Sequence, residues 1–112
     1  MKAISWSDFE KIELRAGTVV EVKPFPEARK PAYILKIDFG DSLGIKNASA
    51  QITDHYGLDD LLGKQVICVV NFPPKQIGPF ISECLVTGLY NEDSSVILAV
   101  PDKEVSNGAI LG

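Results

Sequence analysis

The strongest constraint on the fold is that apolar side chains recur at every second position in short stretches bounded by Gly and Pro. Residues 33–39 alternate apolar and charged side chains, which is typical of a strand with one face in the core. The same period in residues 14–22 predicts another strand, where Gly17 indicates a bulge or a tight bend. The side chains predicted to face inward are Leu14, Ala16, Thr18, Val20, Val22, Tyr33, Leu35, Ile37 and Phe39.

Further short strands follow along the chain, and the apolar run at 65–72 is typical of a strand buried on both sides. A single helical turn over Leu58–Leu62, ended by Gly63, is predicted just before this run. A short helix is predicted near the N-terminus, with Ser7 and Glu10 as its capping box. The predicted strands that complete the series are 44–52, 82–90 and 96–100.

Short strands at this spacing predict an all-β barrel or sandwich, and a helical element after the third strand is the layout of the OB barrel. We therefore predict a five-stranded OB-fold barrel with a short N-terminal helix and an ordered C-terminal extension from Pro101. A length of 112 residues fits one domain spanning 1–112. The longest apolar run, Val66–Val70, is far shorter than the roughly 20 residues that cross a bilayer, and no signal peptide is recognisable.

The cysteines and the histidine bear on location and chemistry. Cys68 and Cys84 lie in apolar strand-like runs, so we expect reduced, buried thiols and a cytoplasmic protein, with a disulfide or redox pair as the alternative. His55 is the only histidine, so no metal site is expected and no cofactor is implied. Without a nucleophile motif or a Gly-rich phosphate loop, the sequence does not predict an enzyme.

The charge distribution leaves the nature of the partner open. The net charge of −4 argues mildly against nucleic acid, but residues 1–36 hold seven basic side chains against five acidic ones. Residues 76–112 hold one basic side chain against five acidic ones. If the cations converge on one face they can hold phosphates, and if they scatter they form an ordinary solvated surface.

Residues 71–83 look most like a binding segment, because three prolines and a glycine restrict their conformation. Lys75 lies between the aromatic residues Phe72 and Phe80, a combination that suits base stacking with a phosphate contact. The alternative is that the two phenylalanines close the end of the barrel.

The chain resembles the tRNA-binding domain family over essentially its whole length. The resemblance begins with Asp8–Val19 and continues in the same order through 49–53, 63–66, 71–74 and Ser82-Glu83. The CsaA branch of that family is indicated more narrowly by residues 25–29, 38–40, 70–74 and 106–112.

The resemblance implies an OB-fold homodimer that binds tRNA or another structured RNA through shape and backbone contacts. It implies RNA contacts at Asn71, Lys75, Ser82 and Glu83, and we expect Arg29, Lys30 and Lys36 along the same groove. CsaA proteins are also described as export-related chaperones that bind unfolded precursor proteins and the Sec machinery. The dimer contact is predicted at Ile4, Trp6 and Phe9. Together these side chains have more apolar surface than a short N-terminal arm is expected to expose to water.

The alternative function is that of a chaperone. Where the family's loop is usually rich in Lys and Arg, this chain has Gln76, Gly78, Pro79 and Ile81. Such a loop suits an extended peptide, and the predicted apolar contacts are Phe72, Ile77, Phe80 and Ile81.

Overall fold

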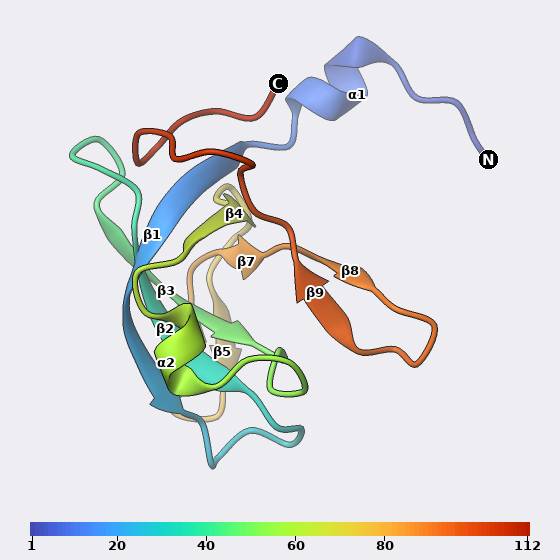
Figure 1. Ribbon diagram of the computed structural model, residues 1–112. Helices are drawn as coiled ribbons and strands as arrows, with labels where there is room; N and C mark the ends of the chain where they lie inside the picture. Colours follow the sequence, from blue (N-terminus) through green and yellow to red (C-terminus); the bar gives the residue numbers. More distant parts are fainter.

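The computed structural model describes residues 1–112, which form a barrel with an N-terminal arm at one end (Figure 1). One five-stranded antiparallel sheet has the order β3-β2-β1-β4-β7, and two hairpins, β5–β6 and β8–β9, are added to it. The elements are α1 (Trp6–Glu10), β1 (Leu14–Pro24), β2 (Tyr33–Asp38), β3 (Ile45–Ala50), α2 (Leu58–Leu61), β4 (Gln65–Val69), β5 (Lys75–Ile77), β6 (Phe80–Ser82), β7 (Leu85–Val86), β8 (Gly88–Tyr90) and β9 (Val96–Leu98).

The sheet curls until its two edge strands meet. The backbone N–H of Glu83, just before β7, donates to Asn47 O in β3 at 2.8 Å. The N–H of Asn47 donates in return to the Glu83 carboxylate at 3.0 Å. The predicted all-β fold, a five-stranded barrel with a helical turn between β3 and β4, is confirmed.

The buried face of β1 differs from the one that the sequence predicts. Val19 is 1% exposed, whereas Val20 is 44% exposed. The register of β1 against β2 shifts between Val19 and Glu21, so a bulge at this point reverses the alternation. At Gly17 a Cβ atom would lie 2.6 Å from Ile37 Cγ2, so the backbone itself approaches the core there.

The C-terminal extension is ordered, as predicted, and it covers the first half of β1. Ala16 N donates to Ala109 O at 2.9 Å, and Gly108 N donates to Ala16 O at 2.7 Å. Ala16 is therefore buried beneath this extension, outside the core of the barrel.

The core contains both cysteines as free thiols, among Leu35, Ile37, Phe39, Leu61 and Val66. The pKa of Cys68 is raised by a hydrogen bond with Cys84 and by burial. The pKa of Cys84 is lowered, chiefly by the hydrogen bond with Cys68. Neither helix is long and apolar enough to cross a membrane.

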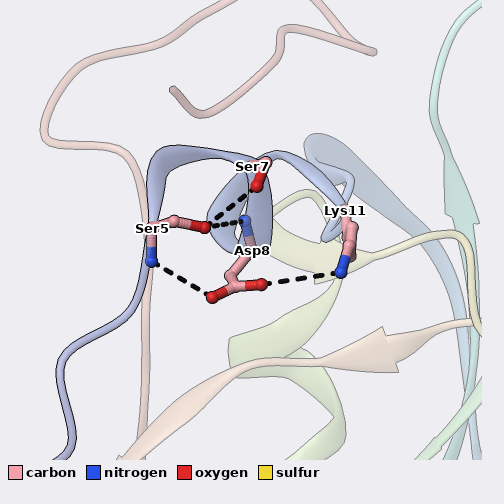
Figure 2. Close-up of polar contacts among 4 residues, drawn as sticks. All are labelled: Ser5, Ser7, Asp8 and Lys11. Carbon is pink, nitrogen blue, oxygen red and sulfur yellow. Dashed lines mark hydrogen bonds and ion pairs between the residues drawn. The ribbon is translucent and has the colours of Figure 1, made fainter.

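Helix α1 begins two residues earlier than predicted, because Ser5 and not Ser7 is its N-cap. The Ser5 hydroxyl accepts from the Asp8 N–H at 3.1 Å, and the Asp8 carboxylate accepts from the Ser5 N–H at 3.1 Å (Figure 2). The hydrogen bond from the Ser5 N–H to the carboxylate, followed by the interaction of the carboxylate with the Ser5 side chain, lowers the pKa of Asp8. Ser7 lies inside the helix with its hydroxyl 2.9 Å from that of Ser5, so Glu10 is not part of a capping box.

Two predicted strands have other boundaries. The strand predicted at 65–72 ends at Val69, so Phe72 lies outside it and is exposed. The strand predicted at 82–90 is divided among β6, β7 and β8, because these segments pair with β5, β4 and β9 respectively.

Candidate nucleic-acid interface

The β5–β6 hairpin carries most of the residues predicted to bind RNA or peptide. Its register pairs Lys75 with Ser82 and Ile77 with Phe80 on one face, because side chains alternate along a strand. Gln76 and Ile81 pair on the opposite face. The hairpin turns at Gly78, whose φ of +56° lies in the left-handed region that favours glycine.

The tip of the hairpin packs against the loop between β1 and β2. The rings of Phe80 and Phe25 meet edge to face, with centroids 5.5 Å apart. Arg29 and Lys30 are exposed in this loop, and neither forms an ion pair. The contact therefore places the loop that carries these two predicted RNA-binding cations against the hairpin, although about 50 positions of the sequence separate them.

Lys36 lies in β2 on the outer face of the barrel, since its neighbours Leu35 and Ile37 are buried in the core. Lys36 lies opposite Asn47 in the β2–β3 register, and Asn47 is bonded to Glu83 at the end of the hairpin. On its other side Lys36 faces Glu21, whose carboxylate is 3.5 Å from Lys23 Nζ.

Lys46 in β3 is a further cation that the sequence analysis did not single out, and it lies on the opposite face of the sheet from Lys36 because it pairs with the buried Ile37. Its charge lowers the pKa of Cys84, against an opposite effect of Glu83. None of Lys36, Lys46 and Lys75 forms an ion pair. In the sequence, the only indication of a role for Lys46 is its position in a predicted strand that neighbours the predicted strand of Lys36.

A hollow of about 340 Å³ opens between the base of the hairpin and β7. Phe72, Pro73 and Leu85 form its apolar part, and Lys75 and Ser82 its polar part, with Cys84 as the sixth lining residue. The Ser82 hydroxyl donates to Cys84 O at 3.2 Å, so its lone pairs are left as acceptors.

Two of the predicted RNA-binding residues have structural partners. The side-chain amide of Asn71 accepts from the N–H of Glu13 at 3.0 Å and donates to Lys11 O at 2.7 Å. Glu83 accepts from Asn47, as described above, which fits the orienting role that we expected of it. Both side chains fix the ends of the binding segment.

The four predicted peptide contacts do not form one surface. Ile77 and Phe80 lie on the hairpin face that meets Phe25, whereas Ile81 lies on the opposite face. Phe72 lines the hollow at the base and is 55% exposed. The alternative that both phenylalanines close the barrel does not hold for Phe72, since it is exposed.

The three predicted dimer residues do gather in one place. Ile4, Trp6 and Phe9 line a hollow of about 470 Å³ together with Ser5 and the C-terminal Gly112. Trp6 is 79% exposed, and its ring meets that of Phe9 edge to face. Figure 1 shows the arm and the C-terminus at the same end of the barrel.

His55 has a partner that the sequence did not reveal. Its Nε2 lies 2.7 Å from Ser95 Oγ, and Ser95 donates to the Asp93 carboxylate at 2.6 Å. Because the hydroxyl proton already points to Asp93, His55 is not placed to remove it as a base would. No group of three or more His, Cys, Asp or Glu side chains could hold a metal ion.

A five-stranded barrel with cations around one hairpin defines a class of OB-fold binding domain. The family described as "Putative tRNA binding domain" matches residues 14–110. The chain belongs to this tRNA-binding domain family, and within it to the CsaA type.

Curated relatives include methionine–tRNA ligases. That of Pyrococcus horikoshii is 36% identical over 109 residues, which are 97% of this chain and 14% of the ligase. That of Bacteroides fragilis is 32% identical over 106 residues, 95% of this chain and 15% of the ligase. The chain thus spans only about a seventh of the length of these relatives.

Solved structures match over nearly the whole chain. The CsaA chaperone protein of Picrophilus torridus is 52% identical, with a TM-score of 0.92 and coverage of 98% of this chain and 100% of the other. The chaperone CsaA of Bacillus anthracis is 46% identical, with a TM-score of 0.93 and coverage of 99% and 100%.

Proposed function

We propose that this chain binds tRNA or another structured RNA as a homodimer, through the face formed by the β5–β6 hairpin and the strands and loop beside it. The observation that carries the proposal is the presence of two cations without an ion pair at the hairpin base, Lys75 in the hollow and Lys46 near Cys84. Such cations release counterions from RNA phosphates, which favours binding despite the net charge of −4.

The test is binding of a tRNA transcript to wild type and to charge variants across a salt series. Lys75→Gln and Lys46→Gln are each expected to lower the magnitude of the salt slope by about 1. Lys103→Gln is the matched control, since Lys103 lines a separate hollow with Gln65, at the opposite end of β4. Absence of binding at low salt, or an equal loss in the control, would contradict the proposal.

The dimer is proposed to form through the arm residues Ile4, Trp6 and Phe9. No residue of α1 is buried within the chain, so this apolar surface has no partner in the protomer. Sedimentation is expected to give twice the 12.2 kDa mass of the chain, and Trp6→Glu is expected to give the single mass. A wild-type mass of one chain would overturn the dimer and leave RNA binding to be tested on the monomer.

A chaperone function is the second proposal, and the apolar part of the hollow at Phe72 and Leu85 favours it. The two CsaA proteins with solved structures are also named chaperones. Its ligands would be extended segments of unfolded precursor proteins in the cytoplasm, in line with the free thiols. At stoichiometric amounts the protein is expected to suppress aggregation of a chemically denatured client, and unchanged aggregation contradicts this role.

A further inference from the structure

The hollow at the hairpin base has the size and lining of a small ligand site. Its volume of about 340 Å³ lies at the lower end of the range of ligand pockets, about 300–1,000 Å³. Phe72 presents an exposed aromatic ring that the fold does not use for its core. The hollow therefore offers an aromatic platform beside polar groups.

The charges around this hollow distinguish it from the two others. Lys75 is the only charged side chain that lines it. The polar hollow beside Gln65 has Lys64 and Lys103 but also Asp102 and Glu104, so its charges balance. The hollow of the N-terminal arm has no charged side chain in its lining. Of these three hollows, only the one at Phe72 therefore fits an anionic ligand with an aromatic part.

We propose that this hollow binds one unpaired nucleotide of an otherwise folded RNA, with its base stacked on Phe72 and its phosphate at Lys75. The inference rests on the proposed RNA-binding function and names the part of the RNA that the hollow recognises. Base–aromatic stacking requires an unpaired base, because the faces of a paired base are covered by its neighbours. Ser82 adds an acceptor for a ribose 2′-hydroxyl, since its own proton is given to Cys84 O.

Two RNA probes test the inference: a blunt-ended hairpin, and the same hairpin with a short single-stranded overhang that contains 2-aminopurine. Wild type is expected to bind the overhang RNA about five- to a hundred-fold more tightly than the blunt RNA, with a change in 2-aminopurine fluorescence. The test variants Phe72→Ala and Phe72→Leu remove the aromatic ring, whereas the conservative variant Phe72→Tyr retains it. Ile81→Ala is the matched control, because Ile81 is exposed on the opposite hairpin face.

The overhang preference is expected to disappear in Phe72→Ala and Phe72→Leu and to remain in Phe72→Tyr and Ile81→Ala. Loss in Phe72→Leu identifies stacking, because leucine keeps the apolar contact that a peptide would use. Thermal unfolding checks that each variant is folded.

Equal binding of both RNAs by wild type overturns the inference but leaves the proposed RNA binding intact. Absence of binding to either RNA overturns both the inference and the proposed RNA-binding function. If Phe72→Ala leaves the overhang preference unchanged and weakens only the binding of an extended apolar peptide, the hollow is a peptide site and the inference is wrong.

Discussion

The ring of Phe80 packs edge to face on the ring of Phe25, with centroids 5.5 Å apart and an angle of 64° between the planes. Phe25 is buried in the loop between β1 and β2, and Phe80 stands at the tip of the β5–β6 hairpin. A two-stranded hairpin is marginally stable by itself, so this contact holds it against the barrel. This aromatic pair fixes the tip of the hairpin, and the hydrogen bonds between Glu83 and Asn47 fix its other end.

Phe80→Ala is expected to lower the free energy of unfolding by roughly 1–3 kcal/mol, since it removes a partly buried ring and an aromatic pair. Urea denaturation measures the loss, and hydrogen exchange of the β5 and β6 amides is expected to become faster. Ile81→Ala, on the other hairpin face, is expected to stay within about 0.5 kcal/mol of wild type. Equal effects of the two variants would contradict this role of the pair.

Gly17→Ala is expected to destabilise the protein by about 1–3 kcal/mol, because a methyl group there would overlap Ile37 Cγ2 and the ring of Phe39. The measurement is the midpoint of urea unfolding at neutral pH. An unchanged midpoint would show that the core shifts to accept the methyl group at no cost.

Asn71→Ala is expected to cost about 1 kcal/mol of stability, since the hydrogen bonds to Glu13 and Lys11 are lost. Because both functional groups of Asn71 already have partners, the salt slope of RNA binding is expected to stay unchanged in this variant. Lys75→Gln should show the reverse pattern, with normal stability and a smaller slope. A reduced slope in Asn71→Ala would instead indicate direct contact with RNA.

Asp93 links stability to pH. Hydrogen bonds from the Ser95 hydroxyl and backbone N–H hold the pKa of Asp93 below its ordinary value near 3.8. The carboxyl of Asp93 binds a proton less readily in the folded state than in the unfolded state. Its contribution to the stability of the fold is therefore present above pH 3.8 and is lost as the pH falls through the lowered pKa of the folded state. Unfolding midpoints between neutral and acidic pH should therefore fall less steeply in Asp93→Asn, and parallel curves would contradict this.

The two thiols are expected to react in a fixed order. Cys84 lines the hollow and is 5% exposed, whereas Cys68 is fully buried in the core, so a reagent reaches Cys84 first. Timed alkylation with iodoacetamide, followed by peptide mass spectrometry, should label Cys84 before Cys68. Earlier labelling of Cys68 would show that the strands open before either thiol reacts.

The proposed binding face was only partly predictable from the sequence. Lys75, Ser82 and Phe72 lie close together in the chain, so their common hollow follows from the local segment. Lys46 was missed, because its approach to Cys84 depends on the closure of the barrel between β3 and β7. Ile81 was grouped with the other apolar residues of the segment, but the hairpin register directs it to the opposite face.

The sequence by itself determined the main strands of the barrel and the helical turn α2, but not the β5–β6 hairpin, because a two-residue period and Gly or Pro boundaries are local properties of the chain. The tertiary structure decided which face of β1 is buried, where the strand at 82–90 breaks, and which serine caps α1. The buried face of β1 and the break in the strand predicted at 82–90 both depend on pairing between distant segments. In β1, a bulge at Val20 reverses the alternation that the local period predicts. The cap depends on the start of the helix, where Ser5 and Ser7 are both suitable residues.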